Sequence, residues 1–190
     1  MLIVSGGDLV GKSTFVKRAY AKLDSLGFRH MPHHLTRPPK NFDYYKGYLD
    51  LISPYTIWDR FALDSLAYRQ IDSHPCQMTP MKWSLVEAAC RHHGGFQVIL
   101  CCRNDQTIVE RYNEDRPGQV HMYPAGHAVR VNSTFRQMLN LTSVMVRGQS
   151  YRYRWDYAVY TDDANADAKL DECIEAYVKH FNDWENVNAG

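Results

Sequence analysis

Short apolar runs alternate along the chain with longer stretches in which apolar residues recur every three or four positions. Runs of this kind are typical of buried strands. In chain order, the runs that predict strands are Leu2–Ser5, Arg29–Leu35, Tyr55–Trp58, Phe96–Cys102 and Tyr157–Tyr160. The run FQVILCC at 96–102 is the clearest, because a continuous apolar run is expected inside a parallel sheet.

The stretches between these runs have the spacing of amphipathic helices. They predict helices at about 13–26, 62–72, 79–92, 105–115, 132–146 and 166–181. Asn132 is the expected cap of the helix that runs to about Val146, and the stretch from Pro117 to His127 is interpreted as a mobile loop. Strands that alternate with helices predict an α/β fold, a three-layer sandwich around a five-stranded parallel sheet in a single domain at 1–190.

One glycine-rich segment indicates phosphate binding. Residues 6–14 (GGDLVGKST), called the phosphate loop below, fit the pattern GxxxxGK[ST] directly after the first predicted strand. Glycines let backbone N–H groups turn toward an anion, and the helix that follows directs its positive dipole end at the same point. The residues expected to bind ATP are Gly6, Gly7, Asp8, Leu9, Val10, Gly11, Lys12, Ser13 and Thr14. The alternative is a glycine-rich turn without a ligand.

Within this loop, Lys12 is expected to reach the β- and γ-phosphates and the Ser13 hydroxyl to coordinate Mg²⁺. A second candidate lies at the end of the third predicted strand, where Asp59 and Arg60 follow Trp58. Residues at the carboxyl ends of parallel strands line the ligand crevice. An Asp there can hold Mg²⁺, and an Arg can bind a phosphate with both arms of its guanidinium. The alternative is an Asp-Arg pair that caps a helix.

Three motifs in this order resemble those of thymidylate kinases, within the wider superfamily of P-loop deoxynucleoside and deoxynucleotide kinases. Asp8 stands four residues before Lys12, as in that family. The segment 35–38 (LTRP) resembles the family's Thr-Arg-Glu-Pro without the Glu. The segment 59–68 keeps Asp-Arg-aromatic and Ala-Tyr at the family's spacing, with Asp64 where Ser is usual.

The resemblance implies a role for each matching residue. Asp8 would contact the sugar 3′-hydroxyl of the acceptor, while Arg37 and Arg60 would hold its phosphate. Asp59 would organise Mg²⁺ and the transferred phosphoryl group, and the Tyr68 ring would crowd out a 2′-hydroxyl. These assignments make the acceptor a deoxynucleotide.

Leu9 stands where some family members have a catalytic Arg, so the sequence predicts that this charge comes from a lid at about 105–127. Arg111 and Arg116 are the candidates, although a surface ion pair between Arg111 and Glu114 is the alternative for the first. Asp64 is expected to point toward the acceptor base. Phe42 is a candidate stacking platform for that base, with a short amphipathic helix as the equally weighted alternative.

Composition adds limits on partners and location. The 22 basic and 21 acidic residues give a net charge of +1, so no strongly basic nucleic-acid surface is indicated. Five cysteines without CxxC spacing are typical of reduced thiols, and the first apolar run is too short for a signal peptide or a membrane span. We therefore expect a cytoplasmic protein, in the host cytoplasm if phage-encoded, with no membrane partner. Two adjacent histidine pairs, 33–34 and 92–93, are interpreted as surface residues, and the family resemblance suggests a homodimer.

Three functions remain open at this point. The first is an ATP- and Mg²⁺-dependent transfer of phosphate to a pyrimidine deoxynucleoside monophosphate, dTMP or a modified relative. The second is phosphorylation of 5-hydroxymethyluracil within phage DNA. The Glu after Arg37 is missing, and only 21 residues separate Arg37 from Asp59, so the base-binding helix of cellular thymidylate kinases is expected to be shortened or replaced by 41–51. This trimmed pattern resembles that of bacteriophage kinases. The third is a nucleotide-binding regulatory module without transfer activity.

Overall fold

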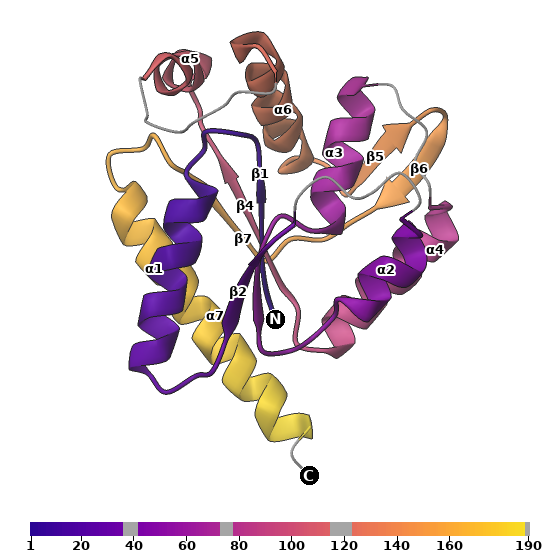
Figure 1. Cartoon of the computed structure of the whole chain (residues 1–190), viewed down its shortest axis with the longest axis vertical. Coiled ribbons are helices and arrows are strands. Elements are labelled where there is room, and N and C mark those ends of the chain that lie inside the picture. Colours follow the sequence, from indigo (N-terminus) through magenta and orange to yellow (C-terminus); the bar gives the residue numbers. More distant parts are fainter. Residues whose placement is uncertain (36–41, 73–77, 115–122, 189–190) are drawn as a thin grey trace.

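The computed structural model describes residues 1–35, 42–72, 78–114 and 123–188. Five parallel strands form the central sheet, in the order β2-β3-β1-β4-β7 (Figure 1). Their bounds are β1 (Leu2–Gly6), β2 (Met31–His34), β3 (Thr56–Asp59), β4 (Phe96–Cys101) and β7 (Tyr157–Tyr160). All five lie within one residue or two of the predicted runs. In β1, β3 and β4, which are buried throughout, the apolar run reflects the covering of both strand faces, whereas β2 is exposed along its length.

Helices cover both faces of this sheet, which confirms the three-layer α/β prediction. The helices are α1 (Lys12–Ser25), α2 (Tyr44–Asp50), α3 (Ala62–Asp72), α4 (Pro80–His92), α5 (Asp105–Asn113), α6 (Ala125–Met138) and α7 (Ala166–Asn188). On one face, α1 and α7 pack on an apolar cluster that includes Leu2 and Ile57. On the other face, α2, α3 and α4 pack on a second cluster that includes Ile3 and Trp58. Consecutive strand residues therefore supply opposite layers.

The region 123–152 differs from the sequence prediction. Helix α6 begins at Ala125 and ends at Met138, so His127 belongs to a helix and Asn132 lies fully buried in its interior. The predicted helix end near Val146 is wrong: Ser143–Val146 is strand β5, which pairs antiparallel with β6 (Gln149–Arg152). Four-residue strands are too short to show a clear period, which is why the pattern concealed this hairpin.

Strand register brings the chemical motifs together. Val4 of β1 lies opposite Asp59 of β3, and Gly6 lies opposite Leu100 of β4. The phosphate loop and Asp59 therefore leave the same edge of the sheet, as expected for carboxyl ends of neighbouring parallel strands.

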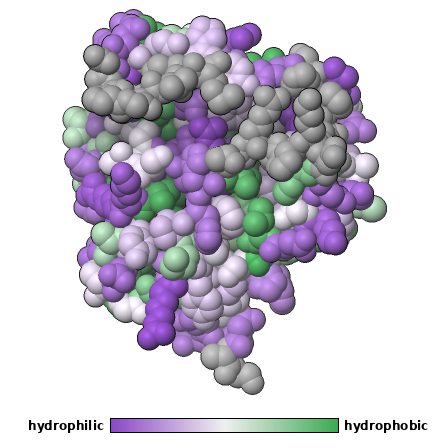
Figure 2. Space-filling view, in the orientation of Figure 1, coloured by the Kyte–Doolittle hydropathy of each residue, from purple (hydrophilic) through white to green (hydrophobic). Residues whose placement is uncertain are grey.

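The molecular face shown in Figure 2 is mainly hydrophilic, with apolar patches between the polar side chains. Across the residues that the structure describes, no helix combines the length and apolar character that crossing a membrane requires.

Candidate functional site

The first two glycines of the phosphate loop pack closely against neighbouring elements. Gly6 has φ +153°, and a Cβ at this position would lie 2.3 Å from the Leu100 carbonyl oxygen, so only glycine fits against β4. Gly7 faces helix α6, where a Cβ would come within 3.1 Å of the Asn132 backbone nitrogen. The glycines of the motif thus let the loop approach two neighbouring elements as well as an anion.

Lys12 begins helix α1 and turns back over the loop. Its Nζ donates to the carbonyl oxygen of Gly6 at 2.9 Å and to that of Gly7. The residue is only 6% exposed, and burial is the main cause that lowers its pKa, with repulsion from Arg60 acting in the same direction. Three carboxylates nearby, those of Asp64, Asp8 and Asp59, oppose this shift. The lysine is held at the loop and retains anionic neighbours that favour its charged form.

Ser13 and Asp59, the two predicted Mg²⁺ ligands, are in direct contact. The Ser13 Oγ donates to Asp59 Oδ2 at 2.6 Å, and the Nδ1 of His34 lies 3.1 Å from the same oxygen. The second carboxylate oxygen, Oδ1, is buried and has no hydrogen-bond partner. A hydroxyl and a buried, unpaired carboxylate oxygen fit Mg²⁺, which prefers few protein ligands together with phosphates and water. No group of three or more His, Cys, Asp or Glu residues that could cage a metal ion occurs in the described part of the chain.

His34 is a neighbour that the sequence did not assign to the site. It is exposed, as predicted for the histidine pair, but its position at the end of β2 brings it beside Asp59. The β2–β3 register pairs His34 directly with Asp59 and explains the contact. The sequence of a short strand does not show which residue of the neighbouring strand lies opposite each of its own residues. The contact between His34 and Asp59 therefore becomes evident only from the pairing of β2 with β3.

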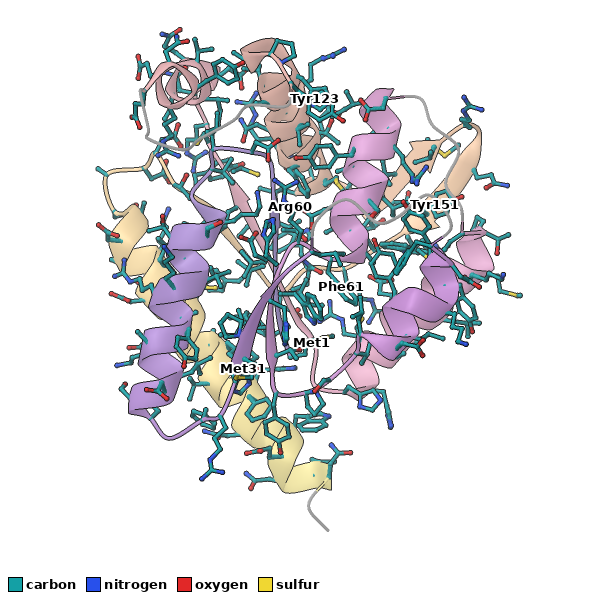
Figure 3. All side chains as sticks on the ribbon, viewed as in Figure 1. Met1, Met31, Arg60, Phe61, Tyr123 and Tyr151 are labelled. Atoms are coloured by element: carbon teal, nitrogen blue, oxygen red, sulfur yellow. The ribbon has the colours of Figure 1, made fainter. Side chains whose placement is uncertain are left out.

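Asp8, Arg60 and Tyr68 form a second group, called the acceptor cluster below. Arg60 donates through one terminal nitrogen to Tyr68 Oη at 3.0 Å and through the other to Asp8. Tyr68 Oη donates in turn to Asp8 Oδ2 at 2.9 Å. Burial alone would raise the pKa of Asp8, but the charges of Arg60 and Lys12 and the Tyr68 hydrogen bond lower it below its ordinary value. Three of the four residues to which the family resemblance gives acceptor roles therefore lie together at the phosphate loop, and Figure 3 labels Arg60 among them.

Arg60 has two features that suit a ligand-binding residue. Its backbone has φ +74°, an uncommon conformation for a residue with a side chain, and its N–H donates to the Val4 carbonyl at 2.9 Å. Its Nε is buried without a hydrogen-bond partner. Strain and an unused donor at one position are typical of a site whose geometry serves binding.

The expected direction of Asp64 toward the acceptor base is wrong. Its carboxylate is buried behind the phosphate loop, where it accepts from Ser5 Oγ at 2.6 Å, Gly6 N at 3.3 Å and Phe61 N at 3.0 Å. Burial raises its pKa, against the opposing effect of the Lys12 charge. In the first turn of a helix, a carboxylate satisfies free backbone N–H groups more readily than it reaches outward. Asp64 thus joins the phosphate loop to the turn that carries Arg60.

Phe42 packs within its own segment. Its ring meets those of Tyr44 and Tyr48 edge to face, with centroids 5.2 and 5.9 Å apart, and it covers Gly47, where a Cβ would come within 2.2 Å of the ring. Tyr48 is fully buried in the cluster beneath α2. These contacts match the short amphipathic helix, the alternative to a stacking platform.

Of the two candidate lid arginines, only Arg111 lies among the described residues. Arg111 lies in α5, where its guanidinium donates to the Leu9 carbonyl oxygen at 2.9 Å and to Thr161 Oγ1 at 3.2 Å. Arg116 and Arg37 lie outside the described residues. Of the predicted lid at about 105–127, the structure describes α5 and the beginning of α6.

Comparison with solved structures supports the fold. The YorR protein from Bacillus subtilis, in complex with phosphorylated GDP, matches with a TM-score of 0.61 and 16% identity, over 94% of this chain and 96% of that one. Deoxyadenosine kinase from M. mycoides with bound dCTP matches with a TM-score of 0.51 and 13% identity, over 94% and 100%. No family model and no curated protein sequence matches the chain. The chain therefore shares its α/β sandwich fold with these two nucleotide-bound proteins.

Proposed function

We propose that the protein transfers the γ-phosphoryl group of ATP, with Mg²⁺, to a pyrimidine deoxynucleoside monophosphate. The observation that carries this proposal is the position of Asp8, which belongs to the phosphate loop and is also hydrogen-bonded to Arg60 and Tyr68. One residue thus joins the segment suited to a nucleoside triphosphate to the cluster suited to a second nucleotide. A regulatory module needs only the first of these.

The structural neighbours agree with the reaction class. One is named as a deoxyadenosine kinase and is solved with dCTP, and the other is solved with phosphorylated GDP. Both matches extend over 94% of this chain. The choice of a pyrimidine acceptor rests on the motif resemblance in 59–68.

In this reaction the bond between the γ-phosphorus and the bridging oxygen of ATP breaks, and a bond forms to an oxygen of the acceptor phosphate. Lys12 and the backbone N–H groups of the phosphate loop bind the triphosphate and stabilise charge on the transferred group. Ser13 and Asp59 would hold Mg²⁺, which when bound neutralises charge on the β- and γ-phosphates. The unpaired Oδ1 of Asp59 leaves a lone pair for this purpose.

On the acceptor side, Arg60 offers a planar set of donors that matches a phosphate. Two of its nitrogens already contact Asp8 and Tyr68, and the third, Nε, is unused. Asp8 fixes the guanidinium beside the loop, so the two phosphates are brought together before reaction, the main source of rate in phosphoryl transfer. Arg116 remains our candidate for the lid charge that completes the site, and Arg37 our candidate for a second contact with the acceptor phosphate.

The test is an ATP-consumption assay across dTMP, dUMP, dCMP, dGMP, dAMP and 5-hydroxymethyl-dUMP, with a duplex oligonucleotide that contains 5-hydroxymethyluracil as a further acceptor. Turnover on a pyrimidine mononucleotide, lost in Asp59→Asn and retained in the exposed control Asp50→Asn, supports the proposal. If the oligonucleotide is phosphorylated and none of the mononucleotides is, the proposed reaction is replaced by phosphorylation of a base within DNA. If the protein binds ATP but phosphorylates no acceptor, the function is that of a nucleotide-binding regulatory module.

A further inference from the structure

We infer that Arg111 is a positioning residue that sets the shape of the phosphate loop. The expected effect on ATP binding rests on the function proposed above, whereas the effect on the loop itself does not. Its guanidinium contacts three segments that are distant in sequence. One terminal nitrogen donates to the Leu9 carbonyl at 2.9 Å, and lies 3.2 Å from Thr161 Oγ1 and 3.3 Å from Cys102 Sγ. The other donates to the Thr161 carbonyl at 3.3 Å. These partners belong to the phosphate loop and to the residues that follow β4 and β7.

The contact with Leu9 acts on a strained residue. Leu9 has φ +67°, a left-handed conformation that is uncommon for a residue with a branched side chain. Such a conformation persists where the surrounding structure holds it. Arg111 supplies a charged donor to the carbonyl of this residue, and charge-assisted hydrogen bonds are stronger than neutral ones.

Fixing this carbonyl also fixes a donor of the loop. The peptide unit between Leu9 and Val10 is planar and trans, so its C=O and N–H point in opposite directions. When Arg111 holds the Leu9 oxygen on the α5 side, the Val10 N–H must face the other way. Backbone N–H groups of such a loop form the anion-binding surface. Arg111 therefore acts on a phosphate through the loop and does not need to touch it.

A second helix, α6, supports the same arrangement. The Asn132 side chain accepts from the Cys102 N–H at 2.9 Å and donates to the Cys102 carbonyl at 3.0 Å. The Asn132 backbone also closes against Gly7, as described above. Cys102 is thus contacted by the side chains of both Arg111 on α5 and Asn132 on α6. The loop is therefore contacted by two helices whose side chains share Cys102 as a partner.

The first measurement needs no nucleotide. In the wild-type protein and in Arg111→Ala, Arg111→Lys and Arg18→Ala, amide hydrogen exchange is followed in the peptide that covers residues 6–14. We expect exchange of the loop amides to be about tenfold faster in Arg111→Ala and intermediate in Arg111→Lys, because the single nitrogen of a lysine cannot reach all four acceptor atoms. Arg18 is the matched control, since it also donates several hydrogen bonds, to Asp167 and Asp171, on the surface between α1 and α7. Its variant should leave loop exchange unchanged.

The second measurement separates positioning from catalysis. By titration calorimetry, Arg111→Ala should weaken ATP binding about tenfold, and its KM for ATP should rise by a similar factor while kcat falls less than threefold. An arginine that acts on the transition state would instead lower kcat at an unchanged Kd for ATP. Purely structural support would lower the melting temperature without altering loop exchange or ATP affinity.

Unchanged loop exchange in Arg111→Ala overturns the inference, whatever the enzyme's activity. Thr161→Val provides a second variant, because it removes one of the Arg111 acceptors, together with weaker contacts of the same hydroxyl to Cys101 and Cys102, and should cause a smaller change in the same direction. Faster loop exchange in a protein that phosphorylates no acceptor would support the inference while refuting the proposed function.

Discussion

The phosphate loop and the acceptor cluster lie side by side but are built differently. The loop is one continuous segment, and its lysine bonds to backbone carbonyls within that segment. The acceptor cluster draws Asp8, Arg60 and Tyr68 from three elements, and side chains hold it together. Motifs identify the residues of both regions, but the contacts among Asp8, Arg60 and Tyr68 form only after the strands are aligned.

The two regions also differ in how they relate to stability. Lys12 is buried, while the side chains of Asp8 and Arg60 are 35% and 26% exposed. Ion pairs with this exposure contribute little to folding, about 1 kcal/mol or less. The left-handed backbone of Arg60 costs free energy as well. The acceptor cluster is therefore organised for binding more than for stability, and substitutions there should alter kinetics before they alter the free energy of unfolding.

The largest effect is expected on the loop. Lys12→Ala should lower kcat by about 10²–10³, because it removes a charge that stabilises the transferred phosphoryl group. The melting temperature should change little, since burial already disfavours the charged amine. Steady-state kinetics and thermal unfolding check this, with the exposed Lys17→Ala as control. A variant that keeps more than about a tenth of wild-type activity would contradict the role of Lys12.

On the acceptor side, Arg60→Ala should reduce kcat/KM for the acceptor about 100-fold, in line with the loss of charged hydrogen bonds. Arg60→Gly should lose as much activity but melt at a higher temperature than Arg60→Ala. The reason is the φ of +74°, which glycine adopts at lower cost, by about 1 kcal/mol. Equal melting temperatures of the two variants would show that the backbone strain is absent in solution.

Asp64 connects the two regions, so Asp64→Asn should destabilise the protein by about 2 kcal/mol. An amide oxygen can replace only one carboxylate oxygen, which leaves a buried donor among Ser5, Gly6 and Phe61 unsatisfied. Urea unfolding at neutral pH measures this, and the exposed Asp50→Asn is the control.

Wild type and Asp64→Asn should also differ in how their free energies of unfolding depend on pH. Burial raises the folded-state pKa of Asp64 above its ordinary value of 3.8, so between these two values the folded state binds more protons than the unfolded state. The stability of wild type relative to Asp64→Asn should then fall as pH rises through that window. A stability difference that grows with pH would mean that the carboxylate is stabilised as an anion.

The smallest effect is expected for Tyr68→Phe. The variant loses the hydroxyl that contacts Asp8 and Arg60 but retains the ring, so the acceptor KM should rise about threefold and stability fall by about 1 kcal/mol. Preference for the deoxy over the ribo form of the acceptor should persist in Tyr68→Phe and decline in Tyr68→Ala. Tyr157→Phe is the matched control, because its hydroxyl also contacts a carboxylate, that of Glu172, in a distant part of the chain.

The sequence by itself determined the sheet and the phosphate loop of this protein. A strand covered on both faces must be continuously apolar, and a loop whose backbone closes on its neighbours requires glycine at fixed positions. Both requirements are local, so Phe96–Cys102 and the segment 6–14 could be identified without tertiary information. The same local logic failed for the β5–β6 hairpin, whose four-residue strands are too short to show a clear period, and for Asn132, whose partner Cys102 is distant in sequence.

Only the tertiary structure decided where the side chains of the site point. Asp64 turns inward because free N–H groups of the phosphate loop and of its own helix lie there, and Arg111 turns to Leu9 because β4 and β7 end beside it. His34 reaches Asp59 because β2 pairs with β3 in that register. A side chain takes the direction in which its polar atoms find partners, and those partners are supplied by segments brought together when the chain folds.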